Sequence, residues 1–110
     1  MRVRLLKEET VLNFALKHAN VESHFQAWLE KIDYADWAEP LDISNTFNSN
    51  LIGDNRVVFD IGGNGRNACR IISEFSFGRK FVHLYINWIG THEAYNNLSN
   101  NDKRIIDIGY

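Results

Sequence analysis

The chain has 110 residues, a length that fits one domain with a single hydrophobic core. Its 45% hydrophobic and 24% charged residues exclude a disordered chain. The apolar runs are too short for a membrane-spanning helix, and the N-terminus has no apolar signal core, so we expect no membrane contact. Cys69 is the only cysteine, which excludes an internal disulfide and favours a reducing cytoplasm.

The net charge of −2 hides an uneven distribution along the chain. Residues 1–48 hold more acidic than basic side chains, whereas residues 56–92 hold more basic ones. A polyanion is therefore expected to bind the second half, although chance fluctuation in a short chain explains the same asymmetry. The basic side chains of that half are Arg56, Arg66, Arg70, Arg79 and Lys80.

The first half predicts a strand and two helices. Residues 3–6 are a short apolar strand, and a helix follows with an apolar stripe at Val11, Leu12, Ala15, Leu16 and Ala19. The second helix is the clearer prediction, because its apolar residues recur at helical spacing. They are Val21, Phe25, Trp28, Leu29 and Ile32. Pro40 opens a short helical turn through Leu41 and Ile43.

The second half changes to the alternating pattern of strands. Turn-forming residues make 44–55 a loop, and strands are expected at 56–61, 69–77 and 81–89, joined by turns. Thr91 can cap a short last helix through Leu98, and residues 99–110 have no assignment. The chain is thus predicted to be one α+β domain over residues 1–110, with the helices on one face of an antiparallel sheet.

Alternation also predicts which side chains share a face of this sheet. Val82, Leu84, Ile86 and Trp88 of the last strand are expected in the core. The opposite face is expected to be open and to carry polar side chains from all three strands, and chemistry is expected there. These side chains are Arg56, Asp60, Arg70, Glu74, His83, Tyr85 and Asn87.

The chain contains a glycine-rich segment and four histidines, and neither is good evidence for a nucleotide or metal site. Residues 63–68 match a relaxed dinucleotide-binding fingerprint, but a strand follows where that fold needs a helix, so a hairpin turn explains the motif better. None of the four histidines has the spacing of a metal-ligand pair, so no metal is expected.

His92 lies just beyond the last strand, near Thr91 and Tyr95, and functional residues are common in such loops at the end of a sheet. A capped helix with Tyr95 in the core is the structural alternative.

A basic strand face with aromatic neighbours is typical of RNA binding. Arginine and lysine neutralise phosphates, and Tyr85 or His83 can stack on an unpaired base. The alternative is a solvated face on which Arg70 pairs with Glu74 or Asp60.

Three segments together resemble the HigB family of bacterial toxins, in the RelE-like superfamily. They are Arg56-Val-Val-Phe-Asp-Ile-Gly-Gly-Asn, Arg70-Ile-Ile, and Val82-His-Leu-Tyr-Ile-Asn-Trp-Ile-Gly-Thr-His-Glu-Ala-Tyr. The helical half and the segment 35–40 agree with the family, and the resemblance covers about residues 1–98. It implies a RelE-like fold and a ribosome-dependent endoribonuclease that cuts mRNA without metal or cofactor.

The resemblance also implies partners and residue roles. The partners are mRNA, the ribosome and a helix-turn-helix antitoxin (HigA-like), with operator DNA bound only through the antitoxin. His92 would be the general acid or base, because an imidazole titrates near neutral pH, Arg70 would hold the phosphate, and Tyr95 would orient His92 or stack on a base. RNA contacts would come from Arg56, Arg66, Arg79, Lys80, His83 and Tyr85.

The chain departs from the family pattern on the expected open face. Glu74 stands where the family usually has a lysine, Asn87 where it usually has an arginine, and the turn before Arg70 is longer by residues 65–69. Both substitutions remove positive charge where phosphate would bind, unless Arg66 on the longer turn compensates. They keep open a second hypothesis, a catalytically weak module of the same fold that binds RNA, the ribosome or the antitoxin.

Overall fold

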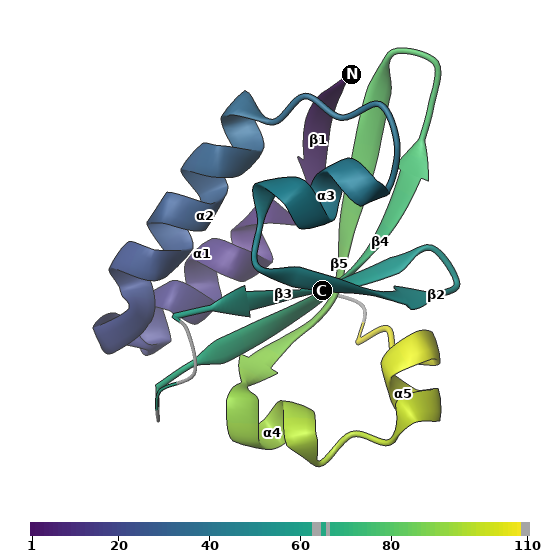
Figure 1. The fold of residues 1–110 in the computed structure, drawn as a ribbon. Helices are drawn as coiled ribbons and strands as arrows, with labels where there is room; N and C mark the ends of the chain where they lie inside the picture. The colour runs from purple at the N-terminus through teal and green to yellow at the C-terminus, as the bar shows by residue number, and fades with distance from the viewer. Residues whose placement is uncertain (63–64, 66, 109–110) are drawn as a thin grey trace.

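The computed structural model describes residues 1–62, 65 and 67–108. A five-stranded sheet of order β1-β5-β4-β3-β2 forms its centre (Figure 1). In chain order the elements are β1 (Arg2–Leu6), α1 (Glu8–Lys17), a 3₁₀ turn (Ala19–Val21), α2 (Glu22–Tyr34), α3 (Leu41–Thr46), β2 (Ser49–Gly53), β3 (Arg56–Ile61), β4 (Cys69–Phe77), β5 (Phe81–Thr91), α4 (His92–Asn96) and α5 (Asn100–Ile105).

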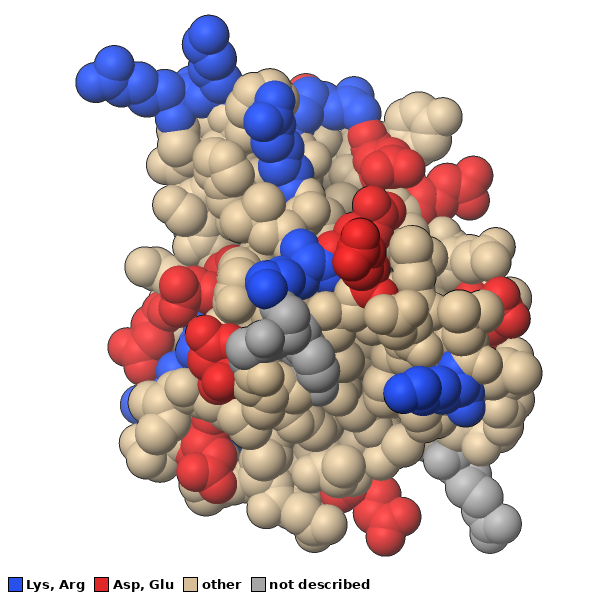
Figure 2. All heavy atoms as spheres, turned by 180° about the vertical axis from the view of Figure 1, so that it is seen from behind, with Lys and Arg blue, Asp and Glu red and all other residues tan. Residues whose placement is uncertain are grey.

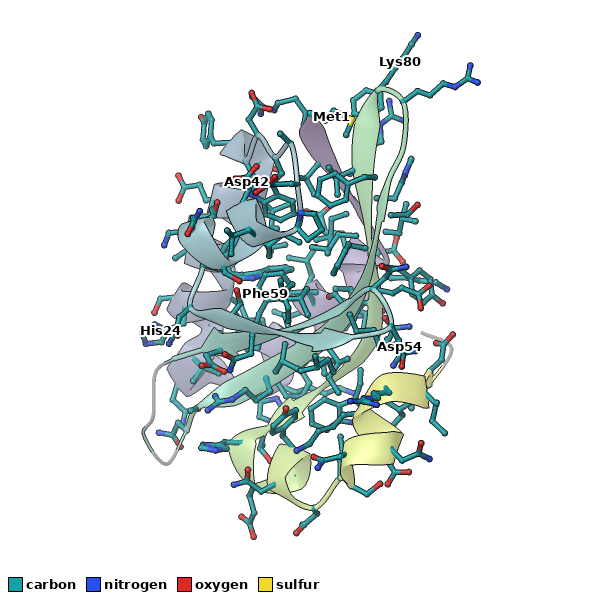
Figure 3. The ribbon with its side chains drawn as sticks, turned by 45° about the vertical axis from the view of Figure 1, so that its right-hand side comes forward. Met1, His24, Asp42, Asp54, Phe59 and Lys80 are labelled. Carbon is teal, nitrogen blue, oxygen red and sulfur yellow. The ribbon has the colours of Figure 1, made fainter. Side chains whose placement is uncertain are left out.

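The main core lies between one face of the sheet and α1, α2 and α3 (Figure 1). The predicted stripe of α2 is confirmed, with Phe25, Trp28 and Ile32 buried. Phe59 of β3 lies in the middle of this layer, where its ring packs edge-on against Trp28 and Phe47 (Figure 3). The α+β class is therefore confirmed, with its core where the helical spacing placed it.

The stripe predicted for α1 is only half right. Val11 and Ala15 are buried, but Leu12 and Leu16 are 44% and 72% exposed. The helix begins after Lys7, whose left-handed backbone (φ 71°) sets the direction of α1 against the sheet. That direction points only one side of the five-residue stripe at the core.

Two features of the sheet were not predicted. β1 joins its edge parallel to β5, so the sheet is mixed rather than purely antiparallel. The predicted loop 44–55 is wrong in part, because it contains the end of α3 and the whole of β2. A two-residue turn joins β2 to β3, and its Asp54 and Asn55 take the positive φ values that such tight hairpins require. The turn residues were visible in the sequence, but the short strand before them was not.

A β-bulge in β5 overturns the predicted position of Trp88. Ile72 pairs with Trp88 but Ser73 pairs with Ile86, so Asn87 is an extra residue in the ladder. Because one extra residue reverses the alternation, Trp88 lies on the face opposite Ile86. Gly90 makes room for it, since a Cβ there would lie 2.5 Å from the indole ring. The prediction that Trp88 joins the main core is therefore wrong.

The second face is not fully open. Val58, Ile72 and Trp88 form a small apolar cluster there, and Ile52, Tyr95, Leu98 and Ile106 pack against it. The predicted last helix is α4, capped by Thr91, whose Oγ1 accepts a hydrogen bond from the Ala94 amide at 3.1 Å. The unassigned tail forms α5 and covers the adjoining part of the same face. The expected open polar face is thus restricted to what α4 and α5 leave uncovered.

Candidate active site

Arg70 is the centre of the candidate site. It lies in β4 opposite Asp60 of β3, and its Nε is 2.8 Å from Asp60 Oδ1. Its Nη1 donates to the Cys69 carbonyl at 3.0 Å, and its Nη2 lies 3.4 Å from His92 Nδ1. With only 6% of its surface exposed, the guanidinium is fixed in direction by these contacts. Of the two carboxylates considered from the sequence, Asp60 is the close partner.

His92 reaches Arg70 because β5 ends directly in α4. Its backbone amide donates to the Ala68 carbonyl at 2.8 Å, which ties the start of α4 to the segment before β4. A guanidinium can only donate hydrogen bonds, so His92 Nδ1 accepts in this contact. A neutral His92 then keeps its proton on Nε2 and has its basic lone pair on Nδ1, directed at Arg70.

Tyr95 follows His92 by three residues, on the same side of α4. Its ring lies between two neighbours, with the Trp88 ring centroid at 6.2 Å and Lys103 Nζ at 4.3 Å. Burial raises the pKa of the Tyr95 hydroxyl, with the Arg70 charge opposing the shift and the Asp60 charge adding to it. The hydroxyl is therefore a protonated donor at neutral pH, within the electric field of the Arg70–Asp60 pair.

Two roles are expected for Tyr95, orienting His92 or stacking on a base. No hydrogen bond joins Tyr95 to His92 in the described part of the chain. Its ring contacts Trp88 and Lys103, so a stacked base has to share the ring with these two neighbours.

Arg56 is not a surface cation. It is 5% exposed, and its Nη1 donates to the carbonyls of Lys103 and Ile106 at 3.3 and 2.7 Å. The C-terminal segment, residues 99–108, lies directly over it and accepts both hydrogen bonds, a cover that the expected RNA contact did not include. These two hydrogen bonds hold the segment on the sheet.

The other expected RNA contacts that the structure describes lie away from His92. Arg79 and Lys80 occupy the turn between β4 and β5, at the end of the molecule opposite α4 (Figures 1 and 3). Lys and Arg side chains gather at that end, above a belt of mixed charge (Figure 2). His83 and Tyr85 are half-buried on β5, opposite Ser76 and Glu74 of β4, between the two ends. Arg66 lies outside the described residues.

The two family departures have different surroundings. Glu74 is 54% exposed, with one oxygen 3.8 Å from Arg56 Nε. Asn87 is the bulged residue of β5; it is 2% exposed, and its backbone carbonyl accepts a hydrogen bond from the Ile108 amide at 3.2 Å. Neither position supplies a positive charge to the site. Both lie beside contacts that hold the C-terminal segment.

Residues 21–98 match the family HigB_toxin, described as the RelE-like toxic component of a toxin-antitoxin system. The chain belongs to this family. It is therefore a toxin component whose family implies an antitoxin partner, and the mixed fold agrees with the RelE-like class. A search of the curated proteins found no match. None of the helices in the described residues is long and apolar enough to cross a membrane.

Two residues of the site region were missed or left open in the sequence. Asp60 was only one of two candidate partners for Arg70, and its pairing depends on strand register. Lys103 gave no signal, because it lies in the tail beyond the family match, and only the folded chain brings it to Tyr95.

Proposed function

We propose that this HigB-family toxin is a ribosome-dependent endoribonuclease that cuts mRNA without a metal ion. The observation that carries the proposal is that Arg70, His92 and Tyr95 lie close together at one end of the sheet. A fixed cation, an imidazole lone pair and a protonated hydroxyl are the groups that phosphate-ester cleavage by an internal nucleophile requires.

In the proposed reaction the RNA 2′-oxygen attacks the adjacent phosphorus and the bond to the 5′-oxygen breaks. Arg70 binds the phosphate and balances the charge that grows on the phosphorane. When the phosphate binds Arg70, Nη2 turns from His92 Nδ1 to the phosphate, and the freed Nδ1 lone pair takes the proton of the 2′-hydroxyl. The departing 5′-oxygen takes up a proton, which the imidazolium can return, and a 2′,3′-cyclic phosphate remains. Tyr95 donates a hydrogen bond to the phosphate.

The arrangement of cations supports ribosome dependence. Arg79 and Lys80 are too far along the sheet to touch a phosphate at Arg70, yet they form a basic end of their own (Figures 2 and 3). We infer that this end contacts ribosomal RNA while the α4 end meets the mRNA. We further propose that the antitoxin is a helix-turn-helix protein that alone contacts operator DNA, and that the toxin acts in the cytoplasm.

The test is induced expression in bacteria with mapping of mRNA 5′ ends. We expect new cuts within translated frames for the wild type and at least a roughly 100-fold loss for His92→Ala, the range of a lost acid–base catalyst. His24→Ala is the matched control, because His24 is an exposed histidine on α2. Equal cutting by wild type and His92→Ala would refute the role of His92.

A second function is favoured by one observation, that Glu74 and Asn87 supply no cation to the site. On that hypothesis the chain binds RNA, the ribosome or its antitoxin without cutting. Intact mRNA together with wild-type protein that sediments with ribosomes would support RNA or ribosome binding. Intact mRNA without sedimentation would leave antitoxin binding.

A further inference from the structure

The C-terminal segment, residues 99–108, lies outside the family match but is held firmly on the sheet. Buried Arg56 donates to two of its carbonyls, and Ile106 packs on the small apolar cluster. A capping box starts α5: the Asp102 amide donates to Ser99 Oγ at 3.0 Å, and the Ser99 amide donates to Asp102 Oδ2 at 3.3 Å. These contacts give the segment a defined position beside α4.

This position brings a cation to the candidate site. Lys103 Nζ lies 4.3 Å from the ring centroid of Tyr95. The charge of Arg70 acts on the hydroxyl of the same tyrosine and opposes the rise in its pKa. Neither Lys103 nor Arg104 forms an ion pair with another described residue. The Lys103 ammonium rests on an aromatic face and still has donors to offer an anion.

A hollow of about 380 Å³ lies beside this cation. Its lining combines the aromatic ring of Tyr95, the two cations, one amide and two apolar side chains of β2. The lining residues are Leu51, Ile52, Tyr95, Asn100, Lys103 and Arg104. Cations next to an aromatic and apolar wall are the chemistry that binds a nucleotide of single-stranded RNA by its phosphate and base.

We propose that Lys103 and Arg104 form a nucleotide subsite for RNA beside the Arg70–His92 site. The subsite holds a phosphate neighbouring the one that is cleaved, and so supplies from outside the family's domain the positive charge that Glu74 and Asn87 remove from the sheet. The inference rests on the proposed function, because it assumes RNA as the ligand.

The test is equilibrium binding of a fluorescein-labelled single-stranded RNA of about ten nucleotides, long enough to cover both sites. Its 2′-hydroxyls are methylated so that it cannot be cut. Anisotropy is measured between about 50 and about 200 mM salt for the wild type, Lys103→Gln and Lys31→Gln. Lys31 is the matched control, because its Nζ also lies over an aromatic ring, that of Phe47 at 5.7 Å, on the opposite face.

We expect Lys103→Gln to lower the magnitude of the salt slope by about 0.7, the value for one lost phosphate contact on a single strand. Its affinity at low salt should fall about 3- to 10-fold, whereas Lys31→Gln should bind as the wild type does. In a second readout, the NMR signals of the Tyr95 ring should shift on addition of the RNA, and those of Phe47 should not.

Other outcomes overturn the subsite in distinguishable ways. Unchanged binding by Lys103→Gln, or equal losses in both variants, refutes Lys103 as a phosphate contact while RNA binding itself stands. Tighter binding by Lys103→Gln means that the segment obstructs the site. If the wild type binds no RNA at about 50 mM salt while its fold is intact, the subsite and the proposed function both fail.

Discussion

Arg56 and Arg70 project from the same face of the sheet and are buried almost equally, yet they contact different parts of the molecule. Arg70 pairs closely with Asp60 and points Nη2 at His92. Among the described residues, Arg56 pairs with half-exposed Glu74 at 3.8 Å, and its Nη1 donates to two carbonyls of the C-terminal segment. The comparison shows that a buried arginine takes its role from the element that covers it. From the sequence both residues looked like RNA contacts.

The largest effect in this comparison should come from breaking the Arg70 pair. Asp60→Ala leaves the buried guanidinium of Arg70 without its carboxylate, which should cost about 3–5 kcal/mol in the free energy of unfolding. Urea denaturation measures this loss. Glu74→Gln is the control at the Arg56 pair, and we expect it to cost no more than about 1 kcal/mol, because Glu74 is half-exposed. Similar losses in the two variants would mean that the pairs are equivalent.

A smaller and more local effect is expected at Arg56. Arg56→Met keeps much of the side-chain volume but leaves the Lys103 and Ile106 carbonyls without their donor, at a cost of about 1–3 kcal/mol. Hydrogen exchange should show faster opening of amides 102–108 and little change in β3, β4 and β5 away from residue 56. Uniform acceleration through the whole sheet would instead make Arg56 a general support of the core.

The smallest effect concerns the ionisation of Tyr95. Burial raises its pKa in the folded chain, so the unfolded chain releases this proton first. The stabilising contribution is therefore complete below about pH 10, the ordinary value for tyrosine, and decreases as the pH rises further. Tyr95→Phe should lose less stability than the wild type between pH 9 and pH 11, as measured by urea denaturation. Parallel curves for both proteins would contradict the shift.

The sequence was most informative where the pattern is regular. The stripe of α2, the three strands from β3 to β5 and the Thr91 cap were all predicted, because each follows from local periodicity or a local hydrogen bond. The errors begin where one residue changes the register. The bulge at Asn87 moves Trp88 to the other face, and no local signal distinguishes it from regular alternation.

In the candidate site, too, some residues could be predicted from the sequence and others could not. Arg70, His92 and Tyr95 could be chosen from the sequence and lie together in the structure. The surroundings could not be chosen, because Asp60, Lys103 and the cover over Arg56 arise from strand register and from a tail with no family pattern. Long-range contacts decided which of the predicted cations are buried, which lie at the distant turn and which adjoin His92.

The pairing of β1 with β5 has a consequence for synthesis of the chain. β1 is translated before the other four described strands, but its partners run from Phe81 to Tyr85 in β5, the last of these strands in chain order. The sheet therefore cannot be completed while the chain is growing through its first 80 residues, and closure depends on contacts distant in sequence, which form slowly. His92 follows β5 directly, so Arg70 meets its imidazole only after all five strands of the described sheet have been made. In a toxin built this way, the candidate site forms after the sheet that carries it is complete.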